Sequence, residues 1–289
     1  MKILIITNLQ NECSEEDVWI AQSFLKDGHE VKLVNKYYNP ELEKQFDIFI
    51  KRYSWIEDIS QFSVGQAESD YETRIVKKDL PRINFDGKFD NSGKHYLSKL
   101  YKKGYHVIPT ISNPKDLAIL PNAERYLVKP VNGYDGFGII ECSREELKYK
   151  WNEDYVIQPK VNFDSELQFY FIGNKFEFAQ IFKPRKINSH ENAYMYTPTK
   201  KEIEIAKSFA MLNGKNFNGV QRIDFLKAGD KILLSELEDD SPYMAIEALK
   251  GSQREAFIND FKSMTYAYYK RKTAATNCDH FDDDEIATE

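Results

Sequence analysis

The second half of the chain carries seven short apolar segments separated by brief polar turns. They cover residues 126–129, 138–141, 155–158, 167–172, 176–182, 220–225 and 232–236. Their alternation and their β-branched and aromatic content, with turns such as Gly173-Asn174 between them, are typical of antiparallel strands. One helix is expected over 203–212, closed by Asn213 and Gly214. This half is therefore predicted to be α+β.

The first fifty residues show a different order of elements. An apolar run at 3–6 is followed by an N-cap and acidic first turn from Ser14, a helical pattern that stops at Gly28, and strands at 31–34 and 46–50. This order predicts a small α/β unit with a mostly parallel sheet. A connecting region over 60–88, a helix over 97–101, a strand over 107–110 and a short helix over 116–120 are expected to lead into the second half.

The size and charge of the chain exclude several classes of protein. Its 289 residues suffice for two or three subdomains, and a net charge of -6 with scattered bases argues against nucleic acid as a partner. Cys13, Cys142 and Cys278 are too widely spaced for a disulfide framework or a zinc site, which suits a reducing compartment. No apolar run approaches the ~20 residues of a membrane span, and the run at 3–6 is too short for a signal peptide. The sequence predicts a soluble, cytoplasmic protein without a membrane partner.

A glycine-rich loop follows a lysine at 128–138, which reads Val-Lys-Pro-Val-Asn-Gly-Tyr-Asp-Gly-Phe-Gly. Lys129 lies on the strand, and the loop holds Gly133, Gly136 and Gly138. Glycines allow backbone N–H groups to approach phosphate oxygens closely, and the lysine adds a positive charge. The loop matches neither the Walker A pattern nor a dinucleotide fingerprint. A hairpin loop with an exposed lysine explains the pattern equally well.

A set of three carboxylates follows near the C-terminal end of the strand-rich half. They are Asp224, Glu236 and Glu238. A period of two places Arg222 and Asp224 on one strand face, and Glu236 and Glu238 on another. If the two strands pair through the turn at 228–230, all three carboxylates can converge on Mg²⁺, which prefers oxygen ligands. A solvated polar face remains the alternative, and Asp239 and Asp240 leave open which acids point inward.

Isolated bases and histidines carry less information. Lys94 precedes a helix, and Lys183 and Arg185 follow a strand; taken singly, each is more typical of a surface charge. The five histidines lack metal-binding spacing, and no nucleophile elbow or catalytic triad pattern is present. These absences weaken the hydrolase interpretation.

Taken in order, these features resemble the ATP-grasp ligases over residues 91–244. The order is a lysine before a helix, a strand lysine with a glycine-rich loop, a strand ending in glutamine, a glutamate eight residues on, a strand lysine, an Arg-x-Asp strand and a Glu-x-Glu strand. Segments 46–55, 91–94 and 236–238, with Pro242 beyond them, resemble the glutathione-synthetase-like branch that includes the D-cycloserine-forming ligase group.

The resemblance implies a fold and a set of roles. It implies a Rossmann-like, pre-ATP-grasp α/β domain at 1–88, a small subdomain with the glycine-rich loop at 89–154, a C-terminal subdomain at 155–272 and an acidic flexible tail at 273–289, with ATP between the two α+β subdomains. The implied nucleotide-binding residues are Lys94, Lys129, Gly133, Gly136, Gly138, Ile157, Gln158 and Glu166. The implied catalytic residues are Arg222 and Lys183, and the implied ligands of Mg²⁺, or alternatively Mn²⁺, are Asp224, Glu236 and Glu238.

The implied activity is ATP-dependent ligation of a small, amino-acid-like carboxylate to an amine or thiol through an acyl phosphate. A kinase of the same family and a catalytically silent nucleotide-binding regulator remain alternatives, and a homodimer is the default expectation for assembly. Two departures concern the substrate and the metal. Many family members carry Asn where Glu238 stands, and residues 190–194 replace the expected Gly-Asp-Phe-Arg stretch.

Overall fold

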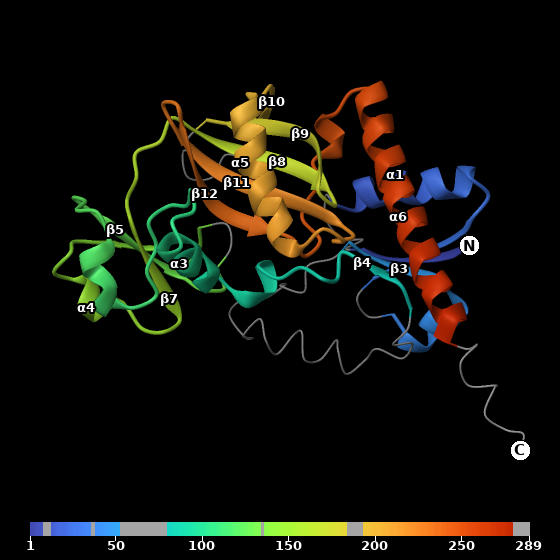
Figure 1. The fold of residues 1–289 in the computed structure, drawn as a ribbon, viewed down its shortest axis with the longest axis horizontal. Helices are drawn as coiled ribbons and strands as arrows, with labels where there is room; N and C mark the ends of the chain where they lie inside the picture. Colours follow the sequence, from blue (N-terminus) through green and yellow to red (C-terminus); the bar gives the residue numbers. More distant parts are fainter. Residues whose placement is uncertain (8–12, 36–37, 53–79, 134–135, 184–192, 280–289) are drawn as a thin grey trace, which may run out of the picture.

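The N-terminal part of the computed structural model is a parallel four-stranded sheet (Figure 1). The structure describes residues 1–7, 13–35, 38–52, 80–133, 136–183 and 193–279. The strands are β1 (Lys2–Thr7), β2 (Glu30–Val34), β3 (Ile48–Arg52) and β4 (Arg82–Ile83), in the order β2-β1-β3-β4. All neighbours are parallel, and α1 (Cys13–Lys26) joins β1 to β2. The predicted parallel α/β unit is confirmed.

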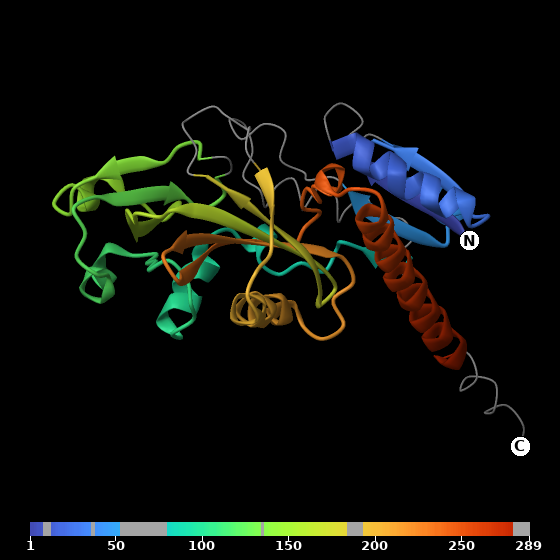
Figure 2. The same ribbon diagram turned by 90° about the horizontal axis from the view of Figure 1, so that it is seen from above.

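The centre of the molecule is a five-stranded antiparallel sheet. Its strands are β8 (Ser165–Ile172), β9 (Lys175–Phe182), β10 (Ala193–Tyr196), β11 (Val220–Ala228) and β12 (Lys231–Glu238), in the order β10-β9-β8-β11-β12. Helix α5 (Lys200–Ala210) covers one face, as Figure 2 shows from above. It begins at a capping box in which Thr199 and Glu202 satisfy each other's backbone N–H groups.

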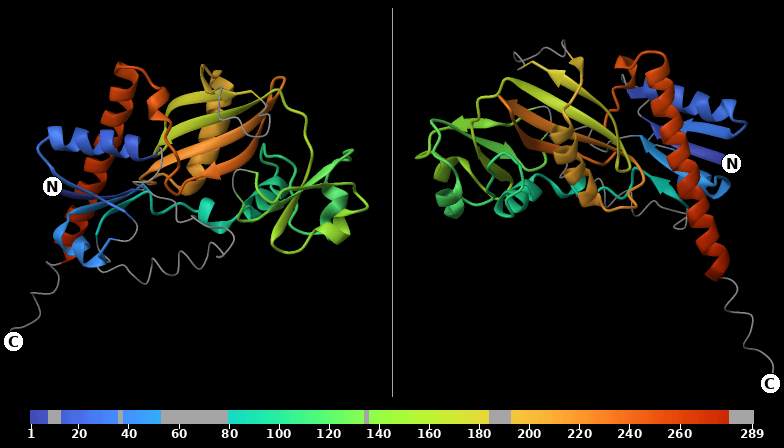
Figure 3. Two further views of the ribbon diagram at one scale, coloured as in Figure 1. Left: turned by 180° about the vertical axis from the view of Figure 1, so that it is seen from behind. Right: turned by 45° about the horizontal axis from the view of Figure 1, so that its top comes forward.

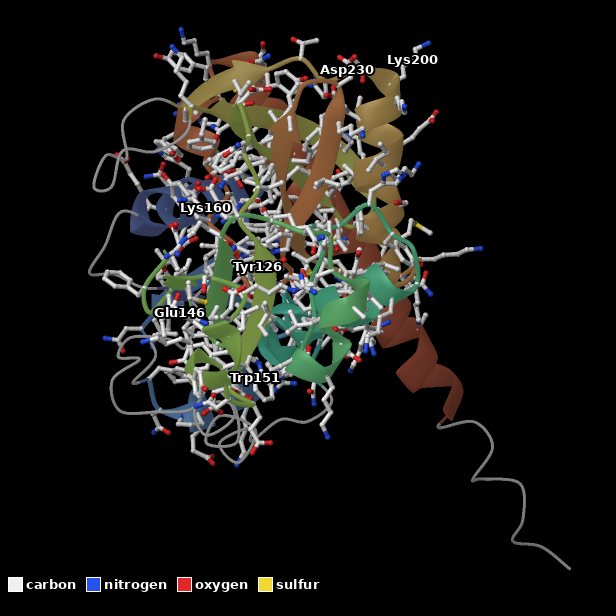
Figure 4. All side chains as sticks on the ribbon, turned by 90° about the vertical axis from the view of Figure 1, so that its left-hand side faces the viewer. Tyr126, Glu146, Trp151, Lys160, Lys200 and Asp230 are labelled. Atoms are coloured by element: carbon white, nitrogen blue, oxygen red, sulfur yellow. The ribbon has the colours of Figure 1, made fainter. Side chains whose placement is uncertain are left out.

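A smaller antiparallel sheet lies at the far end from the N-terminal unit (Figure 1). Its strands are β5 (Tyr126–Pro130), β6 (Ile140–Cys142) and β7 (Tyr155–Pro159), in the order β6-β5-β7. Helices α3 (His95–Lys102) and α4 (Leu147–Lys150) accompany it. Short 3-10 turns complete the chain: η1 (Pro40–Gln45), η2 (Asp90–Ser92), η3 (Pro114–Ile119), η4 (Met211–Asn213) and η5 (Ile246–Ala248). In Figure 4, Tyr126 marks the small sheet and Asp230 the β11–β12 turn.

Four apolar cores explain this arrangement. One packs α5 and α3 against the central sheet, and another covers the other face of the N-terminal sheet. A third joins the N-terminal unit to the central sheet and to the C-terminal helix. Its members include Ile3, Ile50, Tyr170, Phe178, Phe257 and Phe261. The small sheet has a core of its own around Tyr126 and Ile157. Because the core that contains Ile3 and Tyr170 is continuous, the N-terminal unit and the central sheet are packed together.

The expectations for 60–88, 107–110 and 273–279 require correction. The first region was expected only to connect, but it contributes β4 to the parallel sheet. Residues 107–110 form no strand and make only a single parallel bridge, Val107 to Leu234, with Ile111 bridging to Ile157. The sequence patterns did not predict the long helix α6 (Ser252–Asp279). This helix packs against α1 and η5 and runs beside the N-terminal unit (Figure 3). Residues 273–279, expected to begin a flexible tail, continue this helix because its packed face at Phe257, Phe261 and Tyr268 supports it. Residues 280–289 lie outside the described part.

Candidate functional site

Strands β11 and β12 bring the predicted acidic residues onto one face of the central sheet. Asp224 lies opposite Glu236, and Arg222 lies opposite Glu238, with a bulge directly after Asp224. All four side chains are half-buried. The alternating neighbours Ile223 and Leu237 pack with α5, so these four side chains lie on the opposite face of the sheet. The turn at 228–230 makes the hairpin that the sequence predicted.

Arg222 lies between two of these carboxylates. Its Nε donates to Oδ1 of Asp224 at 3.0 Å, and its Nη2 donates to Oδ2 of Asp224 at 3.0 Å and to Oε1 of Glu238. Burial raises the pKa of Glu238 to about 8; Arg222 opposes this shift, and the nearby Asp224 and Glu236 carboxylates add to it. The face therefore holds more carboxyl groups than one guanidinium can keep ionised.

Lys94 connects the glycine-rich loop to β12. Its backbone N–H donates to Val131 O at 2.9 Å, and the preceding Gly93 has φ +66°. A Cβ on Gly93 would lie 2.4 Å from Cγ1 of Val131, so the close approach requires glycine. The Lys94 ammonium donates to Gly133 O and, at 2.7 Å, to Oε1 of Glu236. One lysine thus links the small sheet to the central sheet.

Lys129 comes from β5 and approaches the same place. Withdrawal from water lowers its pKa; the Glu236 carboxylate opposes this shift, the Lys94 ammonium adds to it, and Glu166 opposes it. Among the described residues, no hydrogen bond or ion pair reaches the Lys129 ammonium. This cation therefore remains available to a ligand.

A pocket of about 90 Å³, open to solvent, lies between the two sheets. It is lined by Lys94, Lys129, Pro130, Gly133, Gly136, Phe137, Ile139 and Glu236. Two lysines and the glycine-rich loop form one wall, and a carboxylate of β12 forms the edge. This composition suits a polyphosphate, whose charge the lysines balance and whose oxygens the glycine backbone can approach.

No protein-family model matches the sequence, and no curated protein does. Solved structures match over most of the chain. D-cycloserine synthetase DcsG is 15% identical, with a TM-score of 0.66 over 91% of this chain and 99% of that chain. D-alanine–D-alanine ligase from Bacillus anthracis, complexed with ATP, is 14% identical, with a TM-score of 0.61 over 95% and 99% of the two chains. ATP-grasp ligase PsnB, complexed with minimal precursor, Mg and ADP, is 12% identical, with a TM-score of 0.61 over 91% and 97%.

The chain has the ATP-grasp fold. Solved neighbours with this fold carry ATP, or ADP with Mg, which associates the fold with nucleotide and magnesium. Across the described residues, no helix is long and apolar enough to cross a membrane.

The ATP-grasp structure places the predicted adenine residues away from the pocket lining. Gln158 is only 1% exposed, and its side-chain amide donates to Oγ1 of Thr110 at 3.0 Å. The backbone N–H of Ile157 donates to Ile111 O at 2.8 Å, and Ile157 O accepts from Ile111 N at 3.0 Å. Contact between this backbone and adenine therefore stays a prediction.

The other predicted residues lie around the pocket with different partners. Glu166, on β8, is close enough to Lys129 to influence its pKa. Gly138 has φ +74°, and a Cβ there would lie 2.9 Å from Cγ of Pro130, so it folds the loop against β5. Lys183 is exposed directly after β9, and Arg185 and residues 190–192 lie outside the described part.

The residues fit a hard divalent cation by their chemistry, although they are not gathered around one point. Within the described ranges, no three His, Cys, Asp or Glu side chains are grouped closely enough to hold a metal ion. The reason is visible: Arg222 holds Asp224 and Glu238, while Lys94 holds Glu236. The three carboxylates share one sheet face, offer only oxygen donors and repel one another. Their role as metal ligands stays a prediction.

Two more acids lie beside this face: Asp90, which the sequence patterns did not single out, and Asp239, whose orientation they left open. Burial raises the pKa of Asp90, on η2, well above its ordinary value, and the Glu238 and Asp239 carboxylates raise it further. Asp239 is 1% exposed and accepts hydrogen bonds from several backbone N–H groups. The run of acids after β12 was a signal for Asp239, but its partners come from residues about 150 positions earlier.

Proposed function

We propose that this chain is an ATP-dependent ligase that activates a carboxylate and joins it to a nucleophile, with an amine as the first choice. One observation carries the proposal: Lys94, Lys129 and the glycine-rich loop line the same pocket as Glu236, which is paired in register with Asp224. Solved ligases with the same fold support it.

The residue types suit a two-step reaction. A substrate carboxylate attacks the γ-phosphorus of ATP, which gives an acyl phosphate and ADP. The nucleophile then adds to the acyl carbon, and phosphate leaves as the tetrahedral intermediate collapses. Both steps depend on positioning and charge neutralisation rather than on a protein nucleophile. Lys94 and Lys129 would hold phosphate oxygens. Arg222 would stabilise the oxyanion, worth ~3 kcal/mol on the scale of one such donor.

Asp224, Glu236 and Glu238 would hold Mg²⁺, or Mn²⁺ in its place, which when bound neutralises charge on the transferring phosphate. In the structure Glu236 is paired with Lys94. A nucleotide entering the pocket offers phosphate oxygens to Lys94 and so releases Glu236 for the cation. The ion pair between them would therefore balance the charge of both groups before a nucleotide binds.

The remaining assignments extend this proposal. Gln158 and the Ile157 backbone would border adenine, Glu166 would contact the ribose, and Lys183 would approach phosphate or substrate. The glycine-rich loop, with Gly133, Gly136 and Gly138, would close over the phosphates and exclude water from the acyl phosphate. The substrates would be small, amino-acid-like molecules in a reducing, cytoplasmic setting.

The test is a screen for phosphate release from Mg-ATP across pairs of amino acids and short acidic peptides. The peptides are included because PsnB, a structural neighbour, was solved with a precursor. A ligase releases phosphate only when acid and nucleophile are both present, and a product of their combined mass appears. ADP formation with a stable phosphoester and no free phosphate would show a kinase instead. Nucleotide binding without any turnover would show a silent regulator.

A further inference from the structure

We propose that Asp239 is a positioning residue, which places the Lys94 ammonium in the pocket without touching the ligand. The inference rests on the proposed nucleotide-binding role of Lys94. Asp239 directly follows the last residue of β12, so the strand that carries Glu236 and Glu238 would also fix the lysine opposite them.

The Asp239 carboxylate anchors one backbone segment through hydrogen bonds. It accepts hydrogen bonds from three successive N–H groups, those of Lys88 at 2.8 Å, Phe89 at 3.0 Å and Asp90 at 2.9 Å. The side-chain amide of Asn213 donates a fourth at 2.9 Å. With 1% of its surface exposed, the carboxylate depends on these donors in place of water.

The approach between the two segments is very close. A Cβ on Gly87 would lie 2.5 Å from the backbone oxygen of Asp239 and 2.8 Å from its Oδ1. No other residue type fits at this position without a shift of the backbone. The absence of a side chain at Gly87 therefore allows the 87–90 segment to approach Asp239 closely.

The anchored segment leads to Lys94 within a few residues. Asp90 begins η2, Ser92 N donates to Phe89 O at 3.0 Å, and Gly93 then turns the chain with φ +66°. Lys94 follows at once. The short, bonded path leaves little freedom between the Asp239 anchor and the lysine backbone.

A second contact from β12 supports the far side of Lys94. The backbone N–H of Leu237 donates to the Tyr96 hydroxyl at 2.7 Å, and the Tyr96 ring meets Phe89 edge-on with centroids 5.2 Å apart. Leu237 and Asp239 lie two positions apart on one chain, and they hold the residues on both sides of Lys94. The lysine is thus located by the strand whose carboxylate it contacts.

The experiment measures binding of Mg-ADP by calorimetry, which requires no turnover. Asp239→Asn keeps the shape of the side chain and removes its charge. We expect binding about 10-fold weaker, the lower end of the effect of groups that orient a ligand-binding side chain. Asn213→Ala removes a single donor and should fold readily, with a smaller loss. Glu43→Gln is the control, because Glu43 is a fully buried carboxylate of the N-terminal unit that accepts from Arg82 at 3.0 Å.

A double-mutant cycle separates positioning from general damage. In a Lys94→Met background, Asp239→Asn should no longer weaken Mg-ADP binding, because the residue acts through the lysine that is already gone. An equal loss in both backgrounds, or no loss in the unsubstituted chain, overturns the inference alone. An unsubstituted chain that fails to bind Mg-ADP overturns the proposed function and this inference with it.

Discussion

Arg52 and Arg222 each lie between two carboxylates, in opposite surroundings. Arg52, at the end of β3, donates to Asp17 at 2.9 Å and to Glu16 at 3.2 Å, with all three side chains at most 1% exposed. Arg222 contacts Asp224 and Glu238 with side chains 13%, 16% and 23% exposed. The same chemical group is sealed in one place and open to a pocket region in the other.

The difference shows how packing decides whether a charged cluster stabilises the fold or stays accessible to a ligand. Glu16 accepts from the backbone N–H groups of Met244 and Ile246, and Arg52 also donates to Pro242 O at 2.9 Å. These bonds tie the N-terminal unit to the segment after β12, where Ala245 is held at φ +53°. Such a saturated cluster holds two units together. The Arg222 cluster keeps oxygens within reach of a ligand.

The largest expected effect comes from disrupting the cluster of Arg52, Asp17 and Glu16, which we call the sealed cluster. Arg52→Met leaves Asp17 and Glu16 buried without their cation and should lower the free energy of unfolding by roughly 3–5 kcal/mol. Arg222→Met should cost less, because water can reach Asp224 and Glu238. Urea unfolding of both variants measures the difference. Equal losses of unfolding free energy in the two variants would show that the two clusters contribute equally to stability.

The next largest effect concerns the half-buried acids around Arg222, namely Asp224, Glu238 and the neighbouring Glu236. Asp224→Asn and Glu236→Gln should each reduce ATP turnover by about 100-fold or more, the scale of removing one charge-stabilising group, while unfolding stays close to that of the unsubstituted chain. Asp17→Asn is the matched control in the sealed cluster. It should lose stability and keep turnover in the folded fraction. Unchanged turnover in both pocket variants would remove them from the metal site.

A smaller effect compares two lysines. Lys129→Met should weaken nucleotide binding by about 10–100-fold, the range of a lost charge-assisted hydrogen bond, without loss of stability, because its ammonium has no bonded partner among the described residues. Lys51→Met should do the reverse. Lys51 is buried against Asp240 at 2.6 Å, so its loss lowers the free energy of unfolding. Calorimetry measures nucleotide binding and urea unfolding measures stability, and both are run on both variants. The same loss of binding and of stability in the two variants would contradict this difference between the lysines.

The smallest effect is a pH dependence of the sealed cluster. Burial raises the pKa of Glu16 to about 8, against the opposing charge of Arg52 and with a further rise from Glu247. The folded state then binds a proton that the unfolded state releases above its ordinary pKa of 4.5. This contribution to stability is complete below that pKa and is lost as the pH rises towards 8. The loss should be roughly 1 kcal/mol between pH 6 and 7.

The control for this pH dependence is Glu177→Gln, because burial also raises the pKa of Glu177, to about 7, with the same sign. Urea unfolding at pH 5, 6, 7 and 8 gives the slopes. Glu16→Gln should flatten the slope beyond what Glu177→Gln does. Equal slopes in the unsubstituted chain and in Glu16→Gln would show that Glu16 is ionised in the folded state.

Sequence patterns sufficed where the contacts are local. The β11–β12 hairpin follows from alternation and a turn at 228–230, and the lysine with its glycine-rich loop follows from a run of eleven residues. The patterns failed where partners are distant. The helix α6 as a whole is polar, and its apolar residues Phe257 and Phe261 are explained only by their packing against the N-terminal unit and the central sheet.

Burial by distant segments also decided the fate of single site residues. Gln158 bonds to Thr110, which lies 48 positions earlier, and Asp239 gathers N–H groups from 88–90. Neither partner could be read from the local sequence, because alternation predicts which face a side chain takes and not which segment covers that face. The acidic face and Arg222 on it were predictable from alternation, and the pairing of Lys94 with Glu236, 142 positions later, was not.

The central claim is that residues of two different sheets hold one magnesium nucleotide. The most direct measurement is calorimetric titration with a non-hydrolysable ATP analogue, with and without Mg²⁺, of the unsubstituted chain, Lys129→Met from the small sheet and Asp224→Asn from the central sheet. We expect Mg²⁺-dependent binding that both variants weaken, with the Mg²⁺ dependence kept in Lys129→Met and lost in Asp224→Asn. Binding that ignores Mg²⁺, or that neither variant changes, would contradict it.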